Sequence, residues 1–162
     1  MDLYDAMSTL RAVRRIKSDH ITDDVFDRVL MAAPCAPSGG NRQCWRMIVV
    51  RDPVLKRELE KLYKPHWNEY TKGYEALLKK LSGDKLKQTK RGLEAGNYLS
   101  EHLHDAPVIC VFCFTPAQMT ITDENLKRPS VVGGGSVYPA VQNLLLAARS
   151  AGLGCVLTTL LL

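Results

Sequence analysis

Apolar residues recur at helical intervals in the first part of the chain. Residues 2–10 place apolar side chains three or four positions apart, the spacing of one helix face. These are Leu3, Ala6, Met7 and Leu10. Thr22 precedes a second segment of this kind, and Pro34 follows it. Threonine is a favoured helix N-cap and proline a frequent stop, so the pattern predicts two helices here.

Three further helical patterns lie in the middle and at the end. Asp52-Pro53 opens one that extends to about Tyr63. Residues 64–100 are helical and polar with a loop near 82–84, and their weak apolar stripe predicts a mobile cover. Residues 137–150 are apolar on almost every side, which predicts a buried helix.

Three apolar stretches predict β-strands. Residues 45–50 form the first and residues 155–162 the last. Residues 107–114 are apolar on both faces, which is typical of a strand at the centre of a sheet covered by helices. No repeat or low-complexity linker separates these elements. The pattern therefore predicts one α+β domain over residues 1–162.

Composition argues against several classes of protein. Of 162 residues, 46% are apolar and 24% charged, and no apolar run approaches the roughly 20 residues of a transmembrane helix. The net charge is +5, but bases and acids alternate, as in residues 56–64, which argues against a nucleic-acid surface. The acidic N-terminus does not resemble a secretory signal. We therefore predict a cytoplasmic protein without nucleic-acid or membrane partners.

The cysteines and histidines predict no metal site. Five cysteines at irregular spacing make no disulfide framework. Cys110 and Cys113 would face opposite sides of a strand, so we interpret them as buried packing residues. The histidines lack ligand spacing, and we interpret His102 and His104 as facing solvent. No nucleophile elbow or Cys/His pair is present, so no catalytic side chain is predicted.

Two motifs are candidates for binding a phosphate-bearing cofactor. Arg11 and Arg14, three residues apart at the end of a predicted helix, suit a bidentate grip on one phosphate. The alternative is an ordinary basic surface cluster. The loop 37–45 has glycines that allow close approach to a flat ligand, and its Asn41 and Gln43 each carry a donor and an acceptor. The alternative for the loop is a plain helix-to-strand turn.

Two further motifs could either bind a ligand or serve only the packing of the chain. Gly133-Gly134-Gly135-Ser136 precedes a predicted helix, where glycine loops can bind phosphate, but close helix packing is favoured. Thr158 and Thr159 interrupt an apolar run. Their hydroxyls either face a ligand or bond to the main chain, because buried hydroxyls need partners.

In their order along the whole chain, these motifs resemble those of the FMN-dependent nitroreductase family. Residues 11–16 (R-A-V-R-R-I) are similar to its R-S-x-R-x-F signature. Residues 36–46 are similar to its A-P-S-x-x-N-x-Q-P-W-R signature, the most specific match. Residues 137–154 resemble its buried central helix and the turn after it. Ala12 stands where the family usually has Ser, and Cys44 replaces its Pro.

The resemblance implies an FMN site without a metal or a catalytic side chain. The implied cofactor-binding residues are Arg11, Ala12, Arg14, Pro37, Ser38, Gly39, Asn41, Gln43, Thr158 and Thr159. The first three would lie at the phosphate, although Ala12 offers no hydroxyl to it. Residues 37–39 would come from a partner subunit, and Asn41 and Gln43 would bond the ribityl chain or ring edge. The two threonines would place backbone amides near flavin N5.

The resemblance also implies architecture and activity. The fold would be a three-layer sandwich, a mixed central sheet flanked by helices, in a homodimer with FMN at the subunit interface. NADPH or NADH would reduce FMN, and nitroaromatics, quinones or similar small acceptors would reoxidise it in a ping-pong cycle. Residues 64–100 would cover the substrate side. Because family members continue beyond the position of Leu162, the C-terminal part of the fold is expected to be missing.

Two alternatives stand beside this interpretation. One is a flavoenzyme of the same fold with other chemistry, either reductive dehalogenation or breakdown of the flavin itself, because one fold hosts several reactions. The other is a truncated, non-catalytic remnant that binds flavin weakly or only associates with a partner chain.

Overall fold

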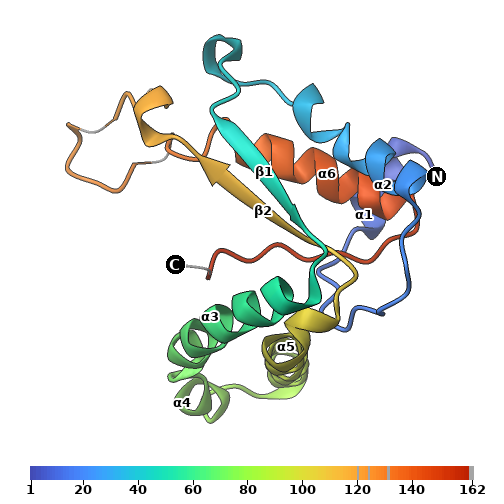
Figure 1. Cartoon of the computed structure of the whole chain (residues 1–162). Helices are drawn as coiled ribbons and strands as arrows, with labels where there is room; N and C mark the ends of the chain where they lie inside the picture. Colours follow the sequence, from blue (N-terminus) through green and yellow to red (C-terminus); the bar gives the residue numbers. More distant parts are fainter. Residues whose placement is uncertain (120, 124, 131, 161–162) are drawn as a thin grey trace. The chain divides into compact units, whose positions relative to one another are not determined.

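The computed structural model describes residues 1–119, 121–123, 125–130 and 132–160, and most of its regular structure is helical (Figure 1). The helices are α1 (Leu3–Thr9), α2 (Asp23–Leu30), α3 (Pro53–Thr71), α4 (Tyr74–Leu78), α5 (Gly83–His102) and α6 (Tyr138–Ser150). The strands are β1 (Trp45–Val50) and β2 (Ile109–Phe114), and the short 3-10 turns are η1 (Ala33–Cys35), η2 (Gly39–Asn41), η3 (Leu103–Asp105) and η4 (Pro116–Gln118). Helices with a small sheet confirm the predicted α+β class.

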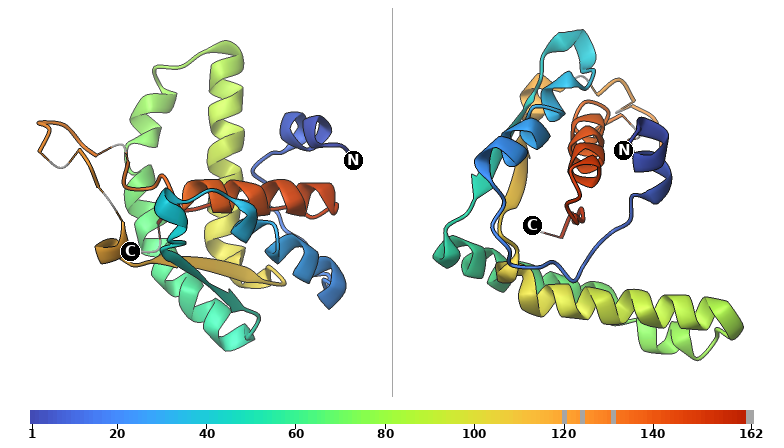
Figure 2. Two further views of the ribbon diagram at one scale, coloured as in Figure 1. Left: turned by 90° about the horizontal axis from the view of Figure 1, so that it is seen from above. Right: turned by 90° about the vertical axis from the view of Figure 1, so that its right-hand side faces the viewer.

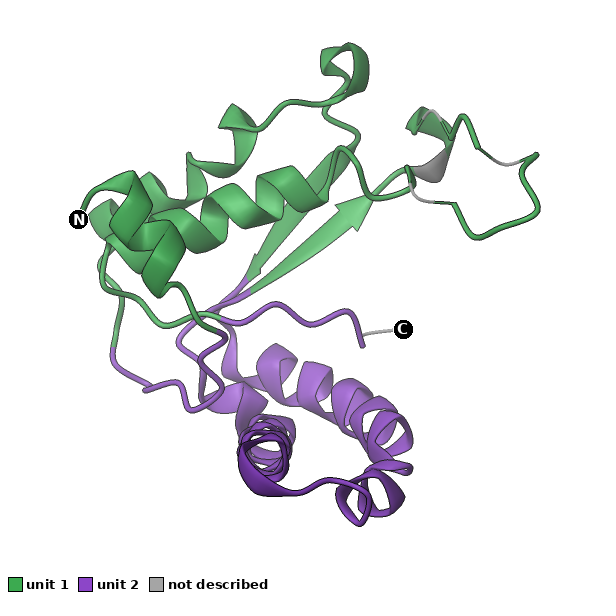
Figure 3. Cartoon of the chain, turned by 180° about the vertical axis from the view of Figure 1, so that it is seen from behind, with its two compact units in different colours: residues 1–11, 20–49, 110–155 green, residues 12–19, 50–109, 156–162 purple. Residues whose placement is uncertain are grey.

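The chain divides into two compact units (Figure 3). The first contains residues 1–11, 20–49 and 110–155, and the second contains residues 12–19, 50–109 and 156–162. None of the helices in the described residues is long and apolar enough to cross a membrane.

In the first unit, α6 packs against α1, α2 and η1 (Figure 2). Its buried residues are Ala140, Val141 and Ala148. The prediction that this helix is buried on almost every side is wrong in extent, because its neighbours cover only part of its surface. Tyr138 is 55% exposed, and residues 144–146 are only half-buried.

The sheet of the described residues has two strands, which run in opposite directions (Figure 1). The backbone N–H of Thr115 donates to the carbonyl of Cys44 at 2.9 Å, which extends the pairing past β2. The rings of Trp45 and Phe112 lie 5.5 Å apart between centroids. In a sheet of two strands both are edge strands, so the predicted central position of β2 is wrong for the described residues. Cys113 is exposed, which corrects its interpretation as a buried packing residue.

The predicted last strand is also absent from the described part of residues 155–162. Cys155 is a single bridge residue, and residues 156–160 have no strand structure. Hydrophobic periodicity does not show whether another strand will lie beside a segment. Without a neighbouring strand, the backbone N–H and C=O groups of an apolar segment cannot form β-sheet hydrogen bonds.

The second unit is built on α3 and α5, which pack together. The side chain of Asp52 caps α3 by accepting from the N–H groups of Val54 and Leu55 at 2.8 and 2.9 Å. Helix α3 runs through Pro65 to Thr71, farther than the predicted end near Tyr63. The core of the unit explains this extension, because Tyr63, Leu99 and Leu103 are buried together and Trp67 packs against them. Burial of large aromatic rings offsets the roughly 3 kcal/mol that an interior proline costs.

Candidate cofactor site

The loop 37–43 has an unusual backbone. Gly40, Asn41 and Gln43 have φ angles of 57°, 53° and 44°. Such left-handed angles are uncommon outside glycine and cluster at functional sites. The loop stabilises them internally, because the N–H of Gln43 donates to the hydroxyl of Ser38 at 3.0 Å and the N–H of Asn41 to the carbonyl of Ser38 at 2.9 Å. The structure therefore brings the loop residues of the predicted site together in one constrained turn.

The same loop presents groups that a ligand can reach. Pro37, Gly39 and Asn41 are exposed, and Ser38 and Gln43 are half-buried. The N–H of Gly39 donates to the hydroxyl of Ser136 at 3.1 Å, across 97 positions of sequence. A Cβ on Gly40 would meet only side-chain atoms of Arg42, the nearest being Cγ at 3.9 Å. The outer surface of the loop thus has the open backbone that a flat ring needs for close approach.

Arg11, at the end of α1, is an exposed cation with part of its hydrogen-bonding capacity in use. Its Nη1 donates to the carbonyl of Ser8 at 2.9 Å and to that of Leu10 at 2.7 Å. These carbonyls lie where a helix leaves acceptors unsatisfied and where a positive charge is favourable. Nε and Nη2 carry three more N–H donors that these two bonds do not use, so a phosphate can still be held.

The other predicted ligands belong to the second unit. Arg14 is half-buried and Ala12 exposed, and Arg14 has no hydrogen bond or ion pair with the rest of the described chain. Thr158 is half-buried and its hydroxyl accepts from the N–H of Leu160 at 3.4 Å, whereas Thr159 is exposed. The local bond agrees with the main-chain interpretation of Thr158. A shared grip of Arg11 and Arg14 on one phosphate stays a prediction.

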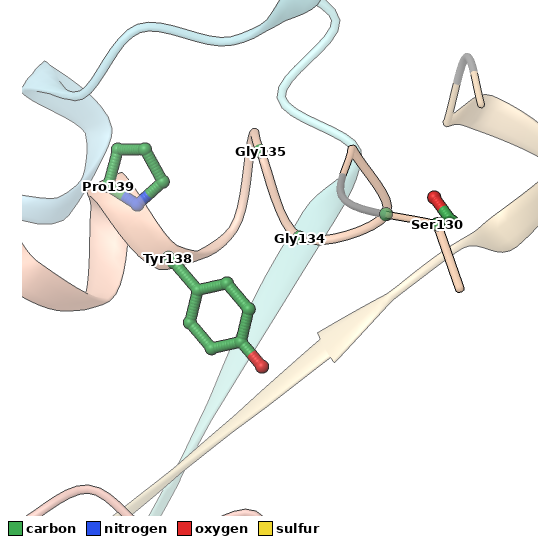
Figure 4. Close-up of a pocket in the computed structure, with 6 residues that line it drawn as sticks. Ser130, Gly134, Gly135, Tyr138 and Pro139 are labelled. Atoms are coloured by element: carbon green, nitrogen blue, oxygen red, sulfur yellow. The ribbon is translucent and has the colours of Figure 1, made fainter. Parts of the chain in front are cut away.

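The glycine segment before α6 is a helix-entry turn. The carbonyl of Gly134 accepts from the N–H groups of Val137 and Tyr138, and a Cβ on Gly134 would overlap the ring of Tyr138. An open hollow beside this turn is lined by Ser130, Gly133, Gly134, Gly135, Tyr138 and Pro139 (Figure 4). Among the described residues, no basic side chain lines the hollow. These contacts support the packing interpretation over a phosphate loop.

A cluster of histidines and carboxylates was not predicted. His104 contacts Glu60 twice, through Nδ1 at 2.6 Å and through its backbone N–H at 3.1 Å. His102 Nδ1 lies 3.0 Å from a carboxylate oxygen of Asp105. Both histidines are half-buried, with side chains 40% exposed at His102 and 32% exposed at His104, so they face solvent only in part. Glu60 is 44 residues from His104, and no local spacing reveals such a pair. The described residues contain no group of three or more His, Cys, Asp or Glu suited to a metal.

A row of aromatic side chains runs along α3 into α4. Tyr63, Trp67, Tyr70 and Tyr74 follow one another with ring centroids 5.8–6.4 Å apart. Tyr70 is 57% exposed. The hydroxyls of Tyr70 and Tyr74 lie 3.4 Å apart, and this hydrogen bond raises the pKa of Tyr74. In the sequence these four aromatic residues are four, three and four positions apart. This spacing places side chains on one face of a helix, so the pattern could have predicted the row.

The described residues fit a flavin mononucleotide in their chemistry. Arginine guanidinium groups match a phosphate dianion, and the exposed glycine backbone of the loop suits a flat ring. The side chains of Asn41 and Gln43 supply neutral donors and acceptors, although Gln43 Nε2 contacts the carbonyl of Pro34 at 3.4 Å. None of the ten predicted ligands is acidic, so nothing in the set repels a phosphate.

Comparison with known proteins gives consistent results. The profile of the Nitroreductase family matches residues 9–162. Iodotyrosine deiodinase 1 of Mus musculus is 29% identical over 98% of this chain and 52% of its own length. A Methanothermobacter thermautotrophicus protein with the provisional name NADH dehydrogenase/NAD(P)H nitroreductase is 28% identical over 98% of this chain and 61% of its own. The chain thus spans about half to three fifths of the length of these relatives.

A solved structure supports the same fold. The nitroreductase with bound FMN from Desulfitobacterium hafniense is 26% identical, with a TM-score of 0.58 over 94% of this chain and 67% of that one. This similarity confirms the predicted nitroreductase-like fold.

Proposed function

Because the chain belongs to the nitroreductase family, we propose that it is an FMN-dependent oxidoreductase. It uses NADPH or NADH to reduce nitroaromatics, quinones or similar small acceptors. The observation that carries the proposal is the constrained loop 37–43, whose left-handed turn coincides with the most specific family-like motif of the sequence. The FMN-bound nitroreductase structure and the relative named for NAD(P)H support the cofactor and the donor.

The residues of this chain have separable roles in the proposal. Arg11 and Arg14 bind the phosphate, and Ala12 lies beside it without a hydroxyl to contribute. Residues 37–39, Asn41 and Gln43 position the ring and ribityl chain, and the backbone at Thr158 and Thr159 lies near the ring. In the proposed homodimer, residues 37–39 act on the cofactor bound mainly by the partner subunit. FMN itself accepts the hydride and passes electrons on, so the protein supplies binding and electrostatics.

No acidic or basic side chain has to transfer a proton in this proposal. The protein instead orients donor and acceptor against one face of the ring, and such placement lowers the barrier by fixing geometry beforehand. The helices of residues 64–100 cover that face and exclude water from it.

Reductive dehalogenation of an aromatic substrate is the second candidate function. Its support is the relative named iodotyrosine deiodinase, at 29% identity over almost the whole chain. The row of aromatic rings from Tyr63 to Tyr74 gives it a physical basis, since exposed Tyr70 can stack on an aromatic ring in an offset or edge-to-face geometry.

The visible spectrum of the purified protein tests the cofactor first, before and after incubation with FMN and desalting. Retained flavin absorbance that bleaches anaerobically with NADPH or NADH supports the oxidoreductase. Protein that retains no flavin contradicts the proposal. Turnover with a nitroaromatic or a quinone, compared with iodide release from 3-iodotyrosine under dithionite reduction, separates the two candidate reactions.

A further inference from the structure

We infer that Ser136 is a positioning residue for the flavin loop 37–43, an inference that rests on the proposed function. The hydroxyl oxygen of Ser136 accepts a hydrogen bond from the N–H of Gly39 at 3.1 Å. This bond joins the start of the loop to the segment that leads into α6. Ser136 contacts the loop rather than the cofactor, so its effect on FMN is indirect.

The loop needs an external anchor because its own bonds are local. Ser38, Asn41 and Gln43 hold one another through hydrogen bonds at 2.9 and 3.0 Å. Those bonds shape the turn but do not place it in the unit. The far end is placed by Cys44, which is 3% exposed and whose carbonyl accepts from Thr115. The bond to Ser136 places the near end.

Ser136 is itself held in place by the turn that precedes α6. The preceding turn is closed by the carbonyl of Gly134, which accepts from the N–H of Val137 at 2.9 Å and from that of Tyr138 at 3.0 Å. Val137 is buried, which ties the turn to the core of the first unit. A hydroxyl held in this way offers Gly39 an acceptor at a fixed point.

The bond also decides which groups remain for the ligand. The N–H of Gly39 is directed to Ser136, so the loop meets the cofactor through its exposed surface at Pro37 and Asn41. Without the bond, the near end of the loop samples more conformations, and FMN must select the competent one. Affinity then falls in proportion to the population of that conformation.

Two variants of Ser136, S136V and S136T, test the inference. Valine and threonine side chains have the same shape, but only threonine has a hydroxyl. We expect FMN fluorescence titration to give S136T a Kd within about twofold of the unsubstituted chain. The Kd of S136V should rise about threefold to tenfold, the effect of one neutral hydrogen bond. S150A, which alters an exposed serine at the C-terminal end of α6, should leave the Kd unchanged.

Hydrogen exchange of the flavin-free protein gives a second readout that needs no cofactor. The amide of Gly39 should exchange faster in S136V than in S136T, while the amides within α6 exchange equally in both. Equal FMN affinity and equal Gly39 exchange in the two variants would overturn the inference and leave the proposed function standing. Failure of the unsubstituted chain to bind FMN would instead overturn the proposed function, and the flavin role of Ser136 with it.

Discussion

The indole ring of Trp67 lies directly against Gly96, in a space that any side chain on Gly96 would occupy. A Cβ built there would overlap the Cη2 and Cζ2 atoms of Trp67. The indole N–H donates to the side chain of the next residue, Asn97, at 2.8 Å. This contact fixes how α3 approaches α5 in the second unit.

We expect Gly96→Ala to destabilise the protein by about 1–3 kcal/mol, the usual cost of overpacking a closely packed site. Gly92→Ala is the matched control on the same helix, since a Cβ on Gly92 meets nothing within 4 Å. Alanine is the better helix former by about 1 kcal/mol, so the control should be neutral or stabilising. Urea unfolding followed by circular dichroism measures both, and equal effects would contradict the assigned contact.

Glu60→Ala should cost about 1–3 kcal/mol in free energy of unfolding, because it removes the acceptor of two hydrogen bonds from His104. The side chain of Glu60 is only 18% exposed, so water replaces it poorly. The control is Glu58→Ala, which breaks a surface ion pair with Lys61 and should cost about 0–1 kcal/mol. A cost for Glu60→Ala no larger than the control's would show that this pair contributes little to stability.

Arg11→Ala and Arg14→Ala should each weaken FMN binding about tenfold or more, because each removes a charged donor from the proposed phosphate site. Arg57→Ala, an exposed change on α3, should leave the affinity unaltered. Fluorescence titration at fixed ionic strength measures the three constants, with circular dichroism to verify folding. If both site variants bind FMN as tightly as the control does, the phosphate assignment fails.

Burial raises the pKa of the Cys155 thiol above its ordinary value. At pH 7–8 less of it is therefore thiolate, the nucleophilic form. We expect iodoacetamide to alkylate exposed Cys35 and Cys113 before Cys155, as followed by peptide mass spectrometry. The raised pKa also has a stability consequence: the neutral thiol favours the folded state below the unfolded pKa, and this contribution is lost as the pH rises through the folded value. Labelling of Cys155 as fast as that of Cys113 would contradict its burial.

Much of the local structure follows from the sequence alone. Most helices begin close to the predicted residues, because caps such as Asp52 and a 3.6-residue period act between near neighbours. The C-terminal end of α3 is the exception, since it lies at Thr71 rather than near Tyr63. The turn in the loop 37–43 also follows from the sequence, since closely spaced glycines, Asn41 and Gln43 predict it and its backbone is left-handed at Gly40, Asn41 and Gln43. Its role in binding a ligand stays a prediction.

Only the tertiary structure decided the longer-range features. The bond of Ser136 to Gly39 spans 97 residues, and that of His104 to Glu60 spans 44. The apolar residues after Cys155 predict a strand, yet residues 156–160 have no strand structure. Hydrogen bonds between distant groups depend on how the elements pack, and periodicity describes one element at a time. The sequence therefore determined which segments are helices and which motifs they carry, while packing determined their partners.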